Sequence, residues 1–200
     1  GNLNVLGDKQ DVSEAKRIED FKVMLKTKNT LATQPDSLYF GIEQVQTKAG
    51  GITENKEVVI APKTGSVTVQ TIGLQYGLRK YGFSENAECE FSLDKTLIGF
   101  DYQGGQIGDS VYYDLNVKRY NGIDYQTVER QNACLGEQMG VVLTANNAPF
   151  ITVTEDDKGE KIRTTASENT FVVLEFAEDG TLSVRVQVRP WGEVNDHIEF

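Results

Sequence analysis

The run TLSVRVQVRPWGEVNDHIEF, from Thr181 to Phe200, indicates the fold more clearly than any other stretch. Apolar and polar residues alternate in its first half, with the apolar ones at Leu182, Val184, Val186 and Val188. Successive side chains of a strand point to opposite faces, so this pattern predicts a half-buried strand with a defined register. Pro190 then ends the ladder because it has no N–H, and Trp191 and Gly192 supply a large anchor and a bend. We expect 194–200 to form a last edge segment.

The same alternation, rich in β-branched and aromatic residues, recurs along the chain and predicts about ten short strands. They are expected at 21–26, 37–45, 58–60, 66–72, 89–93, 111–120, 139–144, 150–154, 170–176 and 181–189. Asn121-Gly122 and Asp179-Gly180 predict hairpin turns. No stretch shows the strand–helix rhythm of a parallel α/β sheet. The sequence therefore predicts a mostly β protein, an antiparallel β-sandwich of Ig-like or transthyretin-like type.

A short helix is expected only near the start, at 12–20, where helix-forming residues follow Asp11 or Ser13 as a cap. We accordingly divide the chain into an N-terminal segment with this helix, 1–20, and one β-sandwich domain, 21–200. A subdivision near 82–86 is the alternative.

The chain has 200 residues and a formal net charge of −10. An acidic surface repels phosphate backbones and anionic lipid, so nucleic acid is not an expected partner. The sequence contains no run of about 18 apolar residues, which is the length that a helix needs to cross a membrane. Any membrane attachment is therefore expected only through a lipid anchor, if the precursor carries one.

Residues for catalysis are scarce, and we expect no enzyme, no cofactor and no metal site. The single histidine, His197, lies in an acidic stretch close to Phe200, where a buried triad is not expected. Cys89 and Cys134 lack the CxxC spacing of zinc and redox sites. They could join distant strands as a disulfide or remain two buried thiols, and the sequence leaves both readings open.

Two loops contain clustered carboxylates. The stretch DYQGGQIGD, 101–109, could be a calcium or sugar loop, but a plain connection between strands is favoured. The stretch EDDKGE, 155–160, lacks the alternating oxygen ligands and closing glutamate of an EF-hand. We interpret it as a solvated hairpin turn.

Aromatic residues provide the candidate binding surface. Tyr112 and Tyr113 are adjacent, so on a strand one ring should be buried and the other exposed. Exposed rings near amide and carboxylate groups can stack on sugars or line a protein interface, whereas packing in the core is the simpler alternative. The residues proposed for this surface are Tyr102, Tyr113, Tyr120, Tyr125 and Trp191.

The terminal motif V-x-P-W-G-x-V, at 188–194, resembles the closing strand of Bacteroidales fimbrillin-like surface lipoproteins. The resemblance covers about the last twenty residues. It implies an outer-surface lipoprotein with transthyretin-like sandwich domains that acts as a pilus subunit, anchor or adhesin. It also implies assembly by strand donation, in which main-chain hydrogen bonds provide affinity and alternate side chains fill pockets.

The leading hypothesis is an extracytoplasmic structural or adhesion protein, such as a fimbrial or surface-assembly subunit, held at the outer membrane or cell surface. Its expected partners are proteins, including further copies of itself, that bind through edge strands. The alternatives are a glycan- or protein-binding surface lipoprotein module and a phage virion structural protein. A hydrolase ranks last, because paired carboxylates are defined by their separation in space.

Overall fold

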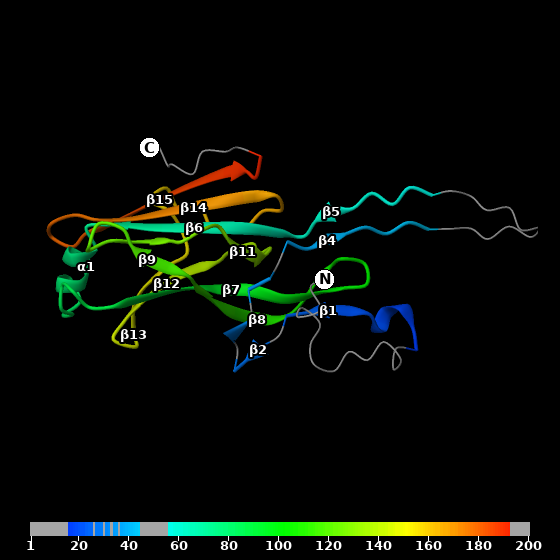
Figure 1. Ribbon diagram of the computed structural model, residues 1–200, viewed down its shortest axis with the longest axis horizontal. Coiled ribbons are helices and arrows are strands. Elements are labelled where there is room, and N and C mark those ends of the chain that lie inside the picture. Colours follow the sequence, from blue (N-terminus) through cyan, green and yellow to red (C-terminus); the bar gives the residue numbers. More distant parts are fainter. Residues whose placement is uncertain are drawn as a thin grey trace, which may run out of the picture.

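The computed structural model describes residues 16–25, 27–29, 31–32, 34–35, 37–44 and 56–192, without the side chains of Ile98 and Asp109. Strands dominate the described part of the chain, as predicted (Figure 1). The predicted helix at 12–20 falls partly outside the described residues, and within them only a 3-10 turn, Ile18–Asp20, is found. The predicted segment 194–200, including His197, also lies outside them.

The first sheet has seven strands in the order β13-β12-β7-β8-β3-β2, with β1 also paired to β7. A long central hairpin joins β7 to β8, which pair antiparallel from Phe91 beside Leu115 to Phe100 beside Gln106. The bounds are β1 Lys22–Met24, β2 Thr27–Lys28, β3 Leu31–Ala32, β7 Cys89–Asp101, β8 Gln106–Leu115, β12 Gly140–Ala145 and β13 Ala148–Val153.

The second sheet has six strands in the order β15-β14-β6-β10-β9, with β11 also paired to β6. The two predicted hairpin turns are confirmed, since Asn121-Gly122 joins β9 to β10 and Asp179-Gly180 joins β14 to β15. The bounds are β6 Thr64–Ile72, β9 Val117–Arg119, β10 Tyr125–Thr127, β11 Gln131–Cys134, β14 Glu168–Phe176 and β15 Leu182–Pro190.

The prediction of purely antiparallel sheets is wrong at the centre of this second sheet. Strands β6 and β14 run parallel, from Ser66 beside Asn169 to Ile72 beside Glu175. Much of the first sheet lies between them in the sequence, so no hairpin imposes an antiparallel direction. A second, shorter parallel contact joins β3 to β8.

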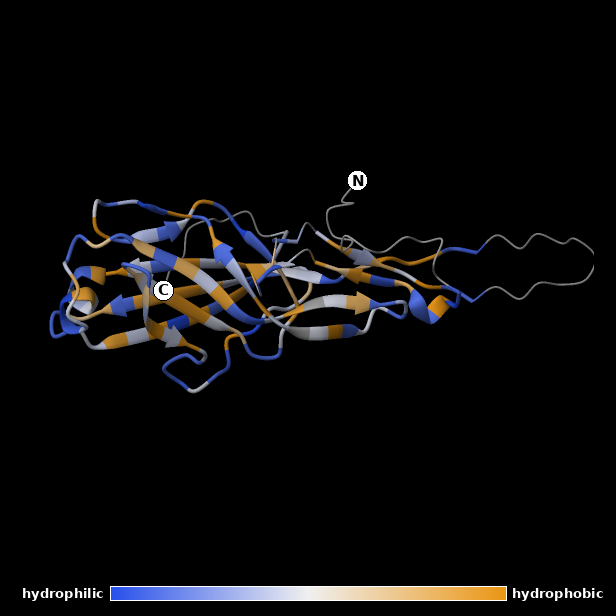
Figure 2. Cartoon of the chain, turned by 90° about the horizontal axis from the view of Figure 1, so that it is seen from below, coloured by the Kyte–Doolittle hydropathy of each residue, from blue (hydrophilic) through white to orange (hydrophobic). Residues whose placement is uncertain are grey.

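The two sheets lie in layers and enclose one hydrophobic core (Figures 1 and 2). Along β6, Val67 and Val69 are fully buried, while Thr68 and Gln70 on the opposite face are only partly buried. The chain passes between sheets at Asn116, which separates β8 from β9. The core contains residues from Leu25 to Val184. The division at residue 20 and the alternative near 82–86 both remain predictions.

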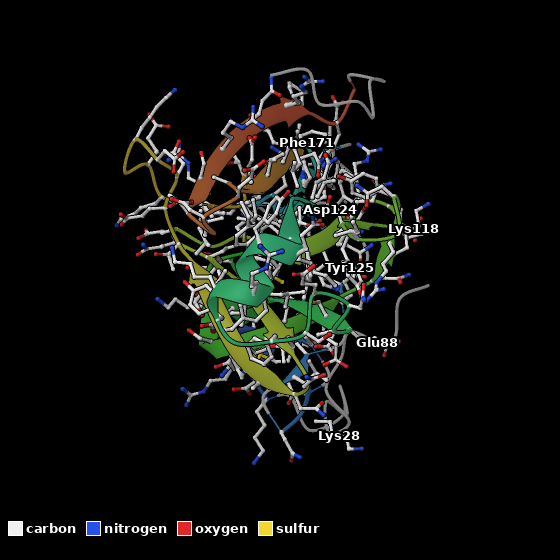
Figure 3. The ribbon with its side chains drawn as sticks, turned by 90° about the vertical axis from the view of Figure 1, so that its left-hand side faces the viewer. Lys28, Glu88, Lys118, Asp124, Tyr125 and Phe171 are labelled. Carbon is white, nitrogen blue, oxygen red and sulfur yellow. The ribbon has the colours of Figure 1, made fainter. Side chains whose placement is uncertain are left out.

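Helix α1, Leu74–Lys80, was missed by the sequence prediction. It closes one end of the two layers, and Asp124 lies beside it (Figure 3). The Asp124 carboxylate accepts a hydrogen bond from the Leu74 N–H at 2.8 Å. The helix is therefore capped by a residue of the β9–β10 turn, far from it in the sequence. A Cβ on Gly77 would lie 2.5 Å from the Phe176 ring, so only glycine allows this close packing.

A third, two-stranded element extends from the body as an arm, β4 Tyr39–Phe40 paired with β5 Ala61–Pro62. We call the described residues 37–44 and 56–62 the arm (Figure 1). Strand β5 passes through Lys63 directly into β6, so one run of chain belongs first to the arm and then to the body. The predicted strand 58–60 precedes β5 and has no regular pairing in the structure.

Candidate binding surfaces

A groove of about 700 Å³ lies on the outer face of the six-stranded sheet. Its floor is made by outward side chains of β6, Ser66, Thr68 and Gln70. Neighbouring strands contribute in register, because Gln126 of β10 faces Gln70 and Asn132 of β11 faces Ser66. We call this cavity the β6 groove. Its floor is built mainly from hydroxyl and amide side chains.

One wall of the β6 groove is formed between β10 and β11, where the hydrogen-bonded pairing along β6 is interrupted. Gln126 pairs with Gln70 and Gln131 pairs with Val67, so the four residues 127–130 face only Thr68 and Val69 on β6. The extra residues must leave the plane of the sheet, as in a β-bulge. Glu129 and Arg130 are exposed on this wall and contribute opposite charges.

Trp191, which follows β15, lies next to this wall, and Arg130 Nη1 donates a hydrogen bond to its carbonyl at 3.5 Å. Its indole Nε1 donates a hydrogen bond to the Ser66 Oγ at 2.9 Å, and its backbone N–H donates to the Ser167 carbonyl at 2.8 Å. Ser66 in turn donates to Asn169 Oδ1 at 2.8 Å, and Asn169 Nδ2 donates to Thr68 Oγ1 at 3.0 Å. This network holds the indole in one orientation before any ligand arrives.

Of the five predicted aromatic residues, the structure brings two to the same groove. Trp191 lines it, and the exposed Tyr120 contacts it, since Gln70 Nε2 donates to the Tyr120 hydroxyl at 3.1 Å. The Tyr120 hydroxyl donates to the Thr71 carbonyl at 2.8 Å. Partial burial, with the nearby Asp124 carboxylate, raises the Tyr120 pKa.

The other three tyrosines lie elsewhere. Tyr113 is fully buried in the core, where burial raises its pKa, and its neighbour Tyr112 is exposed, so the predicted alternation is confirmed. Tyr125 is also buried, and its hydroxyl accepts a hydrogen bond from Arg119 Nε at 2.8 Å. Tyr102 is partly buried in the β7–β8 turn. A surface that uses all five residues together is therefore not assembled.

The arm presents a different kind of surface. Large apolar side chains are exposed along it, including Val59 at 79%, Ile60 at 63% and Tyr39 at 56%. Figure 2 shows hydrophobic residues along this part of the chain as well as in the body. Within the described residues, β4 and β5 pair only with each other, which leaves the outer edge of each strand open.

The base of the arm is attached to the body. Leu38 N–H donates to Thr64 Oγ1 at 3.2 Å, and Lys63 N–H donates to the Leu38 carbonyl at 2.7 Å. The Phe40 ring packs so closely on Gly104 of the β7–β8 turn that a Cβ there would lie 2.6 Å from the ring. The arm therefore leaves the body at a supported point.

Among the described residues, strand β15 is at the edge of its sheet. Part of that edge is already occupied, because Asp157 N–H donates to the Val184 carbonyl at 3.0 Å and Val184 N–H donates to Asp157 Oδ1 at 2.9 Å. Ser183 Oγ also donates to this carboxylate. These bonds lower the Asp157 pKa, and they block strand addition at this position.

The two carboxylate loops are turns. Asp101 Oδ1 accepts hydrogen bonds from the backbone N–H groups of Gln103 and Gly105, at 2.9 and 2.7 Å. The 155–160 stretch reverses the chain between the bridged residues Glu155 and Lys161, as the hairpin interpretation expected. Within the described ranges, no three His, Cys, Asp or Glu side chains gather closely enough to hold a metal ion.

Cys89 and Cys134 are free thiols, and both are buried. Burial raises the pKa of each thiol to about 11. The structure thus selects one of the two readings that the sequence left open. Among the described residues, no helix is long and apolar enough to cross a membrane.

Apart from Trp191, the residues that line the β6 groove were missed as a site. Ser66, Thr68 and Gln70 were visible as the polar face of an alternating strand. Their partners Gln126 and Asn132 lie more than fifty positions away in the printed sequence, and only the strand register brings them together.

Comparison with solved structures finds a similar fold in several bacterial proteins. The fimbrial anchor protein Mfa2 from Porphyromonas gingivalis matches with a TM-score of 0.54 and 15% identity, over 86% of this chain and 66% of that one. A protein from Bacteroides thetaiotaomicron, described as a candidate for polysaccharide binding, matches with a TM-score of 0.60 and 12% identity, over 92% and 69%. A candidate adhesin from Bacteroides ovatus gives 0.58 and 10%, over 91% and 68%.

The chain spans only part of some of these relatives, covering 53% of a candidate cell adhesion protein from Bacteroides uniformis. No curated protein matches it. A family model, described as fimbrillin-A associated anchor proteins Mfa1 and Mfa2, matches residues 2–197. This match covers nearly the whole chain and agrees with the resemblance first found at its C-terminal motif. The chain therefore belongs to the family of fimbrillin-associated anchor proteins.

Proposed function

We propose that this protein holds a fimbrial assembly at the bacterial surface, and that its arm receives an edge strand of the adjoining fimbrial subunit. The observation that carries the proposal is the row of exposed apolar side chains on the arm, beside strand edges that have no partner among the described residues. Such edges bind an added strand through main-chain hydrogen bonds, while side-chain contacts select the partner. Membership of an anchor family supports a fimbrial subunit as that partner.

The arm is a better acceptor than β15. At β15 the backbone groups of Val184 are already bonded to Asp157, whereas Val59 and Ile60 are among the most exposed apolar residues of the described chain. Contiguous exposed apolar surface is uncommon on proteins that work alone, and it marks interaction sites. Glycan binding, the alternative partner class, would fall on the polar β6 groove and not on the arm.

The test is the double variant Val59→Asp with Ile60→Asp, which puts two charges on the arm. In a strain lacking the wild-type protein, we expect fimbriae to be released into the medium instead of remaining on the cells. With purified major fimbrillin of the same bacterium, affinity should fall at least about tenfold, or about 1.4 kcal/mol. Ile123→Asp, which charges an exposed apolar residue outside the arm, is the matched control.

Retention of fimbriae by the folded double variant at the wild-type level would contradict this role of the arm. Circular dichroism of each variant shows whether the fold is intact. If the control releases fimbriae as strongly as the double variant, added charge alone explains the loss, and the proposal fails.

We also propose that a lipid carried by the precursor attaches the protein to the outer membrane. We propose further that the two-layered fold is of Ig-like or transthyretin-like type. The acidic chain offers little attraction to anionic lipid, so a covalent anchor is the expected means of attachment. Mass spectrometry of the protein extracted from native membranes should show an added acyl mass. An unmodified N-terminus in the membrane fraction would contradict the anchor.

A further inference from the structure

The β6 groove combines an ordered aromatic ring with amide groups that have no partner in the described protein. Gln126 and Asn132 both line it and are partly buried, yet neither side chain makes a hydrogen bond to any described residue. An amide offers two donor hydrogens and an acceptor oxygen. Two such groups, held by strands on either side of an interruption, are available to a bound molecule.

The charges of the groove exclude several ligand classes. Among the described residues that line it, only Glu129 and Arg130 are charged, and they are adjacent and opposite in sign. The whole chain carries a net charge of −10, which disfavours phosphates, sulfated polymers and nucleic acid. A cation would need several carboxylates, and Glu129 supplies the single one found in the described part of the lining. The ligand that fits is uncharged and rich in groups that both donate and accept hydrogen bonds.

The geometry also separates this groove from a strand-binding site. Its floor is the face of a sheet, and β6 is paired to β14 on one side and to β10 and β11 on the other. An added strand needs open main-chain groups, which the paired strands of this floor do not offer. The floor presents the polar side chains of Thr68 and Gln70, with the Phe171 ring of β14 beside Thr68. The aromatic side chains Trp191 and Tyr120 lie toward opposite ends, next to Ser66 and Gln70 respectively.

We propose that the β6 groove binds an uncharged oligosaccharide. The apolar face of a sugar ring stacks on Trp191, which the Ser66 hydrogen bond holds in place. Sugar hydroxyls bond to Gln126 and Asn132. These two residues pair with β6 positions four residues apart, about 13 Å along a strand, a span longer than one sugar ring. The site therefore takes several linked units.

The experiment is isothermal titration of the whole protein with short, neutral gluco-, manno-, galacto- and xylo-oligosaccharides. Oligogalacturonate serves as the acidic comparison. We expect saturable binding of at least one neutral oligomer and no preference for the acidic one. Trp191→Ala should weaken binding by at least about tenfold. Tyr112→Ala, which removes an exposed aromatic ring of the other sheet, is the matched control and should bind like wild type.

Because Trp191 also contacts Ser66, its loss could disturb the fold, so a second variant isolates the amides. The double variant Gln126→Ala with Asn132→Ala removes no hydrogen bond of the described protein and should likewise bind at least about tenfold more weakly. The proposal is overturned if no neutral oligomer binds, if oligogalacturonate binds more tightly, or if the folded double variant binds as wild type does. Fimbrial retention depends on the arm, so each result is independent of the proposed anchoring role.

Discussion

The arm and the body share one continuous run of chain, yet the same residue types meet opposite environments in them. Val58, Val59 and Ile60 precede β5 and are exposed, whereas Val67 and Val69, a few residues later in β6, are fully buried. β-Branched residues favour extended backbone in both places. Burial is decided by whether a second sheet lies opposite. In this chain an apolar run therefore indicates an extended segment, and its exposure indicates where a partner is missing.

The largest effect is expected when the same negative charge is placed in the buried body and on the exposed arm. Val69→Asp would bury an unpaired carboxylate and should lower the free energy of unfolding by about 3–5 kcal/mol. Val59→Asp on the arm should change it by less than about 0.5 kcal/mol. Urea unfolding of both variants measures the difference. Equal losses would mean that the arm is packed in solution.

The buried thiols test how closed the body is. Because burial raises the Cys134 pKa from 9.0 to about 11, the folded state keeps the thiol proton that the unfolded chain loses. Stability from this source is complete below pH 9 and is lost as pH rises toward 11. The loss is about 2–3 kcal/mol.

The measurement is chemical unfolding at pH 8 and pH 11, compared with the variant Cys89→Ala with Cys134→Ala, whose pH dependence should be shallower. In addition, a thiol reagent should react with the native protein far more slowly than with the unfolded chain. Rapid reaction of the native thiols would show that the layers open readily.

The hydrogen bond that caps α1 tests the packing at the end of the body away from the arm. Asp124→Ala leaves the buried Leu74 N–H without its acceptor, which should cost about 1–3 kcal/mol. Asp124→Asn retains a side-chain oxygen and should lose less. Thermal unfolding of the two variants distinguishes them, and equal losses would mean that the cap hydrogen bond contributes little.

The edge of β15 is intermediate between arm and body, and the smallest effect is expected there. Asp157→Ala should cost about 0.5–1.5 kcal/mol because the Val184 N–H loses a partner that water can replace. Its hydrogen bonds lower the Asp157 pKa, so this contribution is present above the ordinary carboxyl pKa and is lost as pH falls below it. The free energies of unfolding of variant and wild type should therefore differ at neutral pH and converge as the pH falls below the carboxyl pKa.

Local patterns were enough to predict most long strands of the body and their tightest turns. They missed the short strands β10 and β11, and the predicted strand 111–120 is divided between β8 and β9. Asn121-Gly122 and Asp179-Gly180 form hairpins because their preference for the turn is set by adjacent atoms. The parallel β6–β14 pair could not be predicted in this way, since the choice of partner depends on the packing of the whole chain. Helix α1 was missed for a related reason, because Asp124 caps it and Phe176 packs against Gly77.

The residues of the candidate site also differ in how far the sequence alone could identify them. Trp191 was proposed from the sequence because a terminal Pro-Trp-Gly stop is conspicuous, and the structure places it in the β6 groove. Tyr113 and Tyr125 were proposed with it but are buried, since residue type alone does not give the face of a strand. The amides of Gln126 and Asn132 carry no pattern in the sequence that separates them from any polar loop.

The continuity of β5 with β6 has a mechanical consequence. A pull on the arm is passed along the axis of β6, whose hydrogen bonds to β14 run from Ser66 to Ile72. Those bonds lie across the direction of the force and are loaded in shear, so they resist together instead of opening one at a time as in an unzipping hairpin. A fimbria that is dragged by flow would thus load the part of this fold that is best arranged to bear tension.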